Sequence, residues 1–123
     1  MGRRVGASSA SPLEARFADA LADTMFALST PSRIQILYSL LDRPHDVSEL
    51  VEVLGMGQSA VSHQLRVLRD HSLVTVRREG SRRVYAIYDD HVAALLRQAE
   101  HHVSRRSEEH GLLARVRGSR RAG

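Results

Sequence analysis

Apolar side chains recur at steps of three and four residues along much of the chain, which is the spacing of one face of a helix. The first such segment predicts a helix whose buried face holds Leu13, Phe17, Ala20, Leu21, Thr24, Met25 and Leu28. A second helix is predicted from Thr30 and Pro31, because a threonine hydroxyl caps a helix and proline suits its first turn. Arg43 and Pro44 end this helix, and its inward residues are expected to be Ile34, Leu37, Tyr38 and Leu41.

A third and a fourth helix follow, separated by a short turn that contains glycine. Asp46 and Glu49 have the spacing of a capping box and predict a helix that carries Val47, Leu50, Val51 and Leu54 inward and ends at Gly55. After Gly57 the inner face of the fourth helix is marked by Val61, Leu65 and Leu68. Two helices joined in this way form a helix-turn-helix pattern. His45 is interpreted as a loop residue with no special role.

The segments LVTV and RVYAIY are rich in β-forming residues and flank the polar stretch RREGSR, which predicts a two-stranded hairpin. Asp89 then opens a last helix, whose apolar residues are Val92, Leu95, Leu96, Ala99 and Val103. The predicted fold class is mainly α with a small β-hairpin. One domain is expected over residues 13–105, between a flexible Gly/Ser-rich arm at 1–12 and a loose Arg-rich tail at 106–123.

Composition narrows the possible classes of protein. The 123 residues include 42% hydrophobic residues but no tryptophan, which allows only a small core and favours an oligomer. No cysteine is present, so disulfides and thiolate metal sites are excluded. No leader peptide or membrane span is expected, and the protein is predicted to be cytoplasmic.

Positive charge is concentrated in the middle of the chain. All 18 basic residues are arginine and the net charge is +4. Residues 56–88 hold six arginines against two acids, whereas residues 11–55 hold three against seven. Such a basic segment points to a phosphate-bearing partner.

The side chains of this basic segment suit double-stranded DNA. Away from its apolar face, the fourth helix presents hydrogen-bonding groups of a size that fits base edges and phosphates: Gln58, Ser59, Ser62, His63, Gln64 and Arg66. A merely solvated polar face is the alternative for the helix alone. The hairpin favours the DNA interpretation, because four arginines crowd its tip: Arg77, Arg78, Arg82 and Arg83. His71 follows this helix and is expected to support its C-terminus.

Three stretches carry a resemblance to a known family: LSTPSRIQIL, HDVSELVEVLGMGQSAVSHQLRVLRDHSLV and RREGSRRVYAIY. Over residues 13–105 the chain resembles the ArsR/SmtB family of winged-helix metal-responsive regulators. The resemblance implies a homodimer, formed through the first and last helices, that binds operator DNA and usually releases it when metal binds. QSAVSHQLRVLR lies where that family has its recognition helix. The matching expectation is a palindromic operator with half-sites about one helical turn apart or a multiple of it.

The last helix carries metal-capable side chains in two groups, Asp89 with His91 and, eleven residues later, His101 with His102. At ~1.5 Å per residue, His91 and His102 lie roughly 16 Å apart along one helix, so a single helix cannot close both on one ion. Two antiparallel copies can, and Asp89 and His91 of one subunit then meet His102 of the other. A solvated helix end and a simple N-cap at Asp89 are the alternatives.

The resemblance favours the metal site, because Asp-x-His followed by His eleven residues later is the spacing of the family's inter-subunit site. The family's fourth ligand, however, is replaced by Arg105, which cannot coordinate. Candidates to complete the site are His101, Glu108, His110, the N-terminal arm or water. A shell of nitrogen and oxygen ligands completed by such groups or water suits six-coordinate Ni(II) or Co(II) at least as well as tetrahedral Zn(II). Nickel is the favoured metal, ahead of cobalt or zinc.

The resulting prediction is a DNA-binding repressor, not an enzyme, that is released by a divalent transition metal. Alternatives are a regulator of the same family that senses no metal and a metal-dependent activator, because sequence does not give the sign of the response. A small metal-dependent hydrolase is the alternative from another class. The sequence argues against it, because no paired acid and base lie near a preformed three-ligand site and no nucleophile motif is present. A module that binds a different protein through its last helix is a third possibility.

Overall fold

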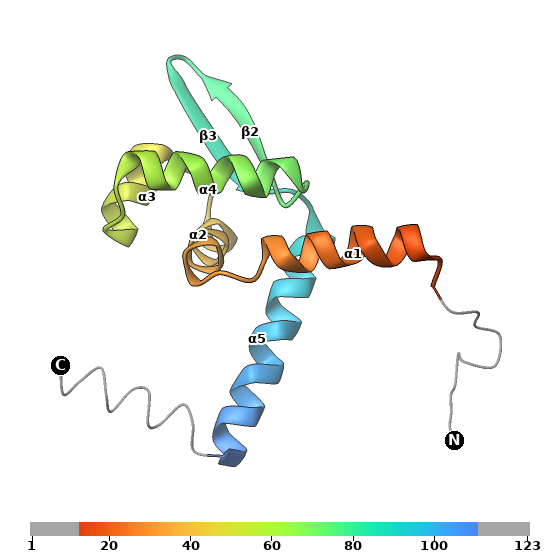
Figure 1. Cartoon of the computed structure of the whole chain (residues 1–123). Coiled ribbons are helices and arrows are strands. Elements are labelled where there is room, and N and C mark those ends of the chain that lie inside the picture. The colour runs from red at the N-terminus through yellow and green to blue at the C-terminus, as the bar shows by residue number, and fades with distance from the viewer. Residues whose placement is uncertain (1–12, 111–123) are drawn as a thin grey trace, which may run out of the picture.

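The computed structural model describes residues 13–110 and contains five helices and three short strands (Figure 1). In chain order the elements are α1 (Ala15–Ala27), α2 (Pro31–Asp42), β1 (His45–Asp46), α3 (Val47–Leu54), α4 (Gln58–Asp70), β2 (Val74–Glu79), β3 (Arg82–Ile87) and α5 (Asp90–His110). The predicted order of helices and hairpin is confirmed. The predicted arm and most of the predicted tail lie outside the described residues.

Local capping signals place the helix boundaries where the sequence predicts them. The Thr30 hydroxyl oxygen accepts from the Arg33 backbone N–H at 3.4 Å, and Pro31 is the first residue of α2. At α3, the Asp46 carboxylate accepts from the Glu49 backbone N–H at 2.8 Å, and the Glu49 carboxylate accepts from that of Asp46 at 2.9 Å. The helix ends at Gly55, whose φ of 67° lies in the left-handed region that glycine adopts without strain.

The sheet has one strand more than the predicted hairpin. β1 pairs antiparallel with β3, with His45 opposite Tyr85 and Asp46 opposite Val84, and the strand order is β1-β3-β2. The interpretation of His45 as a loop residue without a role is therefore wrong. Its side chain is 4% exposed, and its Nδ1 donates to the Arg43 carbonyl oxygen at 2.7 Å. Two residues are too few to show the alternation by which strands are predicted.

The core lies between α2, α3, α4 and the base of the hairpin. On α4 the predicted inner residues Val61, Leu65 and Leu68 are all fully buried. On α2 the innermost side chains are Ile36, Leu37 and Leu40, so the predicted inner face is rotated. The predicted residues Ile34, Tyr38 and Leu41 are half-buried instead, because α2 is apolar on two sides and the second side faces α1 and α5.

The first and last helices project from this core (Figure 1). The predicted buried face of α1 is exposed within one chain: Leu13, Phe17, Leu21 and Met25 are between 40% and 58% exposed. On α5, Val92 and Leu96 are buried near the start of the helix, whereas Val103 is 51% exposed. The Tyr38 hydroxyl donates to the Leu96 carbonyl oxygen and joins α2 to α5. A face with helical spacing is thus not automatically a face buried in its own chain.

Helix α5 continues to His110, five residues beyond the predicted end of the domain at residue 105. Residues 106–110 of the predicted loose tail are therefore helical. Among the described helices, none combines the length and the apolar character needed to cross a membrane.

Candidate nucleic-acid interface and metal-sensing helix

Helix α4 presents most of the predicted DNA-contacting side chains to solvent. Gln58, Ser59, His63 and Arg66 are exposed, and Ser62 is half-buried. The N-cap residue is Gly57, which offers no side chain to the first turn, so the backbone N–H groups there remain available to a phosphate. At the other end, His71 Nδ1 donates to the Val67 carbonyl oxygen at 3.0 Å, as expected of a residue that supports the helix C-terminus.

Gln64 differs from the other predicted contact residues. Its side-chain oxygen accepts a hydrogen bond from Arg33 Nη1 at 2.9 Å, so this half of the amide is engaged inside the protein. Its amide N–H groups have no protein partner among the described residues and remain available to DNA. Sequence reasoning missed Arg33, which is 7% exposed. The available signal was its position on α2, three and four residues before the buried Ile36 and Leu37 and therefore on the inner face.

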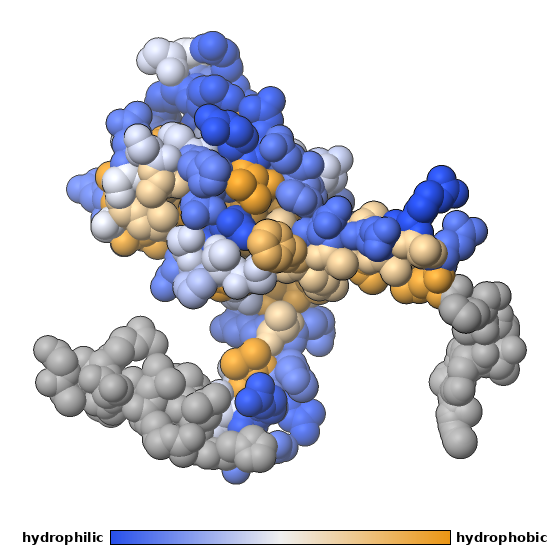
Figure 2. Space-filling model, in the orientation of Figure 1, coloured by the Kyte–Doolittle hydropathy of each residue, from blue (hydrophilic) through white to orange (hydrophobic). Residues whose placement is uncertain are grey.

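The hairpin of β2 and β3 forms a wing covered by hydrophilic residues (Figure 2). Two of its four predicted arginines have acidic partners within the chain. Arg77 pairs with Glu79 at 2.5 Å, and Arg82 pairs with Asp46 at 2.8 Å. Arg82 also reaches Glu49 at 3.4 Å, which attaches the wing to the start of α3. Arg82 is thus engaged in holding the wing in place.

Arg78 and Arg83 are the wing arginines without an acidic partner in the part of the chain that the structure describes. They stand directly opposite each other on β2 and β3. Like charges in opposite positions of a β-ladder destabilise the pair. A phosphate between them would relieve this repulsion, which makes these two the strongest candidates for contact with the DNA backbone.

We expect acid to loosen the attachment of the wing. The Glu49 backbone N–H, and then Arg82, hold the pKa of Asp46 below its ordinary value, and the Asp46 backbone N–H does the same for Glu49. A carboxylate with a lowered folded-state pKa stabilises the fold above its unfolded pKa, and the stabilisation is lost as pH falls through the folded value. Urea unfolding below about pH 5 should therefore show falling stability, with a flatter profile for Asp46→Asn/Glu49→Gln. An unchanged profile in that variant would contradict the assignment.

The first predicted metal-binding group is assembled at the start of α5. The Asp89 carboxylate accepts from the Val92 backbone N–H at 3.1 Å, as in the predicted N-cap. This hydrogen bond, followed by the one from His91, lowers the pKa of Asp89 and keeps it anionic. Its second oxygen lies 3.5 Å from Nδ1 of His91, whose side chain is 97% exposed. Two adjacent groups that could coordinate a metal, the Asp89 carboxylate and the His91 imidazole, thus face solvent.

The second group lies toward the other end of α5. His101, His102 and Glu108 are exposed, and Arg105 pairs with Glu109 at 3.8 Å. The side chain of His110 lies outside the described residues. Within residues 13–110 no cluster of three or more histidine, aspartate or glutamate side chains could hold a metal in a single chain. One chain therefore does not unite Asp89, His91 and His102, as helix geometry requires.

The family assignment comes from comparison with known proteins. A model described as bacterial regulatory protein, arsR family, matches residues 30–76, from the start of α2 into β2. The HTH-type transcriptional regulator NmtR of Mycobacterium tuberculosis is 52% identical over 91 residues, which are 74% of this chain and 76% of that protein. The chain belongs to the ArsR family. It is thus a DNA-binding transcriptional regulator and not an enzyme.

Solved structures agree with this assignment to the ArsR family. The solution structure of apo-NmtR matches with a TM-score of 0.65 at 49% identity, over 81% of both chains. The homodimeric winged helix-turn-helix DNA-binding domain of Mb0332 from Mycobacterium bovis matches with a TM-score of 0.72 at 30% identity, over 77% of this chain and 88% of that one. The predicted winged helix-turn-helix fold is confirmed.

Proposed function

We propose that this ArsR-family protein is a homodimeric repressor that leaves a palindromic operator when a divalent metal binds between its two α5 helices. Asp89 and His91 of one subunit and His102 of the other form the core of each site. The observation that carries this proposal is the separation of exposed ligand groups along α5, together with the absence of a three-ligand cluster in the described part of a single chain. Only a second copy brings the groups together.

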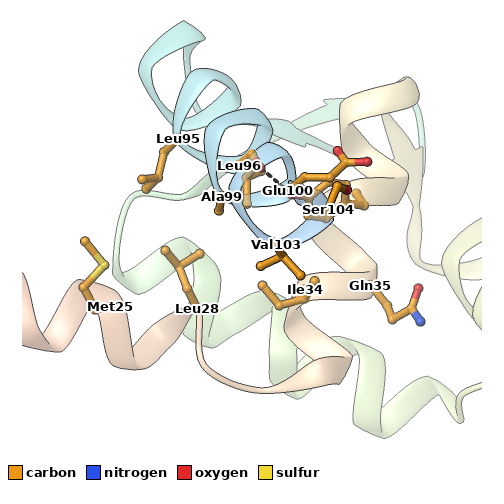
Figure 3. A pocket seen from close by; sticks show the side chains of 11 residues that line it. Met25, Leu28, Ile34, Gln35, Leu95, Leu96, Ala99, Glu100, Val103 and Ser104 are labelled. Carbon is orange, nitrogen blue, oxygen red and sulfur yellow. Dashed lines mark hydrogen bonds between the residues drawn. The ribbon is translucent and has the colours of Figure 1, made fainter. Parts of the chain in front are cut away.

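The surfaces of α1 and α5 support a second copy as the partner. Apolar side chains of both helices and of α2 surround an open groove of about 580 Å³ (Figure 3). Met25, Leu28 and Val103 point toward this groove from α1 and α5 (Figure 3). This groove adjoins the exposed apolar residues Phe17 and Leu21 of α1, and contiguous exposed apolar surface of this kind is typical of an interaction site. The homodimeric state of Mb0332 gives the same expectation for this chain.

The donor set fits a metal with a preference for nitrogen and oxygen. Asp89 is anionic and pre-positioned beside His91, and the ligand groups are open to solvent. Arg105 occupies the family's fourth ligand position and cannot coordinate a metal, and it pairs instead with Glu109. His101, Glu108, His110, residues of the arm or water would complete the shell. A six-coordinate shell of nitrogen and oxygen ligands suits Ni(II) or Co(II) at least as well as tetrahedral Zn(II), and nickel is the metal we propose. The bound metal would supply a bridge between subunits.

The bridge would act on DNA through linkage. Metal that favours one arrangement of the dimer changes the spacing of the two α4 helices, and DNA affinity changes with it. Couplings of this kind are typically about 5- to 150-fold. Release from DNA is the proposed sign. A metal-dependent activator is the alternative with the same site and the opposite sign.

A subunit-mixing experiment tests the inter-subunit site directly. His91→Ala and His102→Ala should each abolish high-affinity nickel binding, measured by isothermal titration calorimetry. When the two variants are mixed, each heterodimer regains one intact site, formed by His91 of one chain and His102 of the other. We therefore expect nickel binding to reappear, at up to one site per heterodimer. A site within one chain would never recover.

The functional experiment measures release of DNA. A duplex is first selected from a random-sequence library by the wild-type protein, and its release on addition of each metal is then measured by fluorescence anisotropy. His71→Asn is the matched control, because it removes a histidine outside α5 and should leave the metal response unchanged.

The second candidate function is a regulator that senses no metal, and the loss of a ligand at Arg105 favours it. Equally negligible metal binding by wild type and both variants would establish that candidate instead.

A further inference from the structure

Arg33 is a buried cation, and within residues 13–110 no carboxylate is among its hydrogen-bond partners. Its guanidinium donates from Nε to the Ala27 carbonyl oxygen at 2.5 Å, from Nη2 to the Phe26 carbonyl oxygen at 3.2 Å and from Nη1 to Gln64 Oε1 at 2.9 Å. We call these three hydrogen bonds the Arg33 bridge. Since a buried charge is retained only when its donors are satisfied, the bridge must hold its partners in a fixed arrangement.

The bridge joins two helices that otherwise contact each other little. Phe26 and Ala27 form the last turn of α1, at the negative end of the helix dipole. The Phe26 carbonyl oxygen also accepts from the Ser29 backbone N–H at 2.9 Å and from the Ser29 hydroxyl at 2.6 Å. Gln64 lies in the middle of α4. Ala27 is the buried residue of α1, while residues 13–23 are all exposed. The direction in which α1 leaves the core therefore depends on this last turn.

The chemistry of the bridge also fixes how Gln64 is presented. A guanidinium has donors and no acceptor, so the oxygen of the Gln64 amide must face Arg33 and its nitrogen must face away. A bidentate contact to adenine needs both the oxygen and the nitrogen of a glutamine. With its oxygen already engaged by Arg33, Gln64 offers DNA chiefly its N–H donors, which suit a phosphate or a base acceptor such as guanine O6 or N7.

We propose that Arg33 is a positioning residue that couples the dimer helix α1 to the recognition helix α4 through Gln64. A shift of α1 against its twin moves the Phe26 and Ala27 carbonyl groups, and the guanidinium passes this movement to the middle of α4. DNA bound at α4 acts on α1 through the same three bonds, as reciprocity of coupling requires. This inference rests on the proposed homodimer and its binding to an operator.

The chain offers a specific probe of this coupling. Its two phenylalanines, Phe17 and Phe26, both lie on α1. Protein labelled with 4-fluorophenylalanine therefore gives fluorine NMR signals from α1 alone. When the duplex selected by the wild-type protein is added to saturation, the Phe26 resonance should shift, although Phe26 lies on a different helix from α4.

The variants separate coupling from stability. Gln64→Leu leaves the bonds of Arg33 to α1 in place and should lower DNA affinity about tenfold, while the Phe26 resonance of the saturated complex stays at its DNA-free position. Gln64→Glu retains an acceptor for Arg33 and should keep the shift, although its charge weakens DNA binding. Arg33→Lys replaces the guanidinium, which donates from three nitrogens, with a single ammonium group. Its DNA affinity and its Phe26 resonance should resemble those of Gln64→Leu, and the double variant Arg33→Lys/Gln64→Leu should lose no further DNA affinity.

The outcomes are distinct for the two proposals. A Phe26 shift in Gln64→Leu equal to that of wild type would overturn the Arg33 bridge as a coupling device and leave the proposed function standing. Losses that add in the double variant would also overturn it, because independent residues add. If the wild-type protein selects no duplex, the proposed operator binding fails, and the inference fails with it.

Discussion

Replacing Leu21 with glutamate should convert the protein to a monomer and lower its affinity for a palindromic duplex about 10²- to 10⁴-fold. Leu21 is 40% exposed and lies with Phe17 and Met25 on the apolar face of α1. In the proposed dimer this face is covered by the second copy, where a carboxylate would be buried without a partner. A monomer contacts one half-site only and loses the gain of simultaneous binding. Sedimentation velocity gives the oligomeric state, and fluorescence anisotropy gives the affinity.

The control for Leu21→Glu is Ala22→Glu. Ala22 is exposed and lies about 100° around α1 from Leu21, to the side of the apolar face, so this variant adds the same charge to the same helix without replacing a residue of that face. It should remain dimeric and bind the duplex nearly as well as wild type. A Leu21→Glu protein that stays dimeric at micromolar concentration would refute the assignment of α1 to the dimer interface. Loss of dimer in both variants would point to a general effect of charge.

Reversing two charges on the wing, in Arg78→Glu/Arg83→Glu, should lower DNA affinity on the order of a thousandfold near 0.15 M salt. Each phosphate contact contributes a slope of about 0.9 to the dependence of log K on log salt, and the double reversal removes about two such contacts per subunit, or about four per dimer. Anisotropy titrations over a range of salt concentrations should show the slope reduced accordingly. Equal slopes in variant and wild type would exclude these side chains from the DNA contact.

The single variant Arg78→Glu separates function from stability. It places a glutamate directly opposite Arg83, so the repulsive cross-strand pair becomes attractive and the free energy of unfolding should rise slightly. DNA affinity should fall at the same time, by about 30-fold. A rise in the free energy of unfolding together with a fall in DNA affinity would indicate that Arg78 and Arg83 serve DNA binding at a cost in stability. Arg97→Glu/Arg106→Glu, on exposed positions of α5, matches the net charge of the double wing variant and should bind DNA far better.

Much of the architecture follows from local signals that a sequence carries openly. Thr30 with Pro31, and Asp46 with Glu49, mark helix starts because a cap is satisfied within a few residues of itself. Val61, Leu65 and Leu68 fix the inner face of α4 because their spacing matches one side of a helix. The two halves of the proposed metal site could be told apart for the same reason, since helix rise alone keeps His91 and His102 apart.

Other features depend on contacts between segments distant in sequence. The third strand exists because β3 lies beside His45 and Asp46, which carry no strand pattern of their own. The exposure of the α1 face was not predictable, because helical spacing shows that a face is apolar and not what covers it. The sequence predicted Arg82 only as a DNA contact, and its ion pairs with Asp46 and Glu49 became visible only in the fold.

The sequence by itself thus determined the helices and the hairpin and supplied the residues of the proposed recognition surface and metal site, because periodicity, capping and side-chain chemistry act over a few residues. Only the tertiary structure decided which polar groups remain available to a partner. In the structure Arg82 pairs with Asp46, and Arg78 lies directly opposite Arg83 without an acidic partner among the described residues. The Gln64 oxygen accepts a hydrogen bond from Arg33. Such assignments need the position of one element against another, and no local pattern encodes that position.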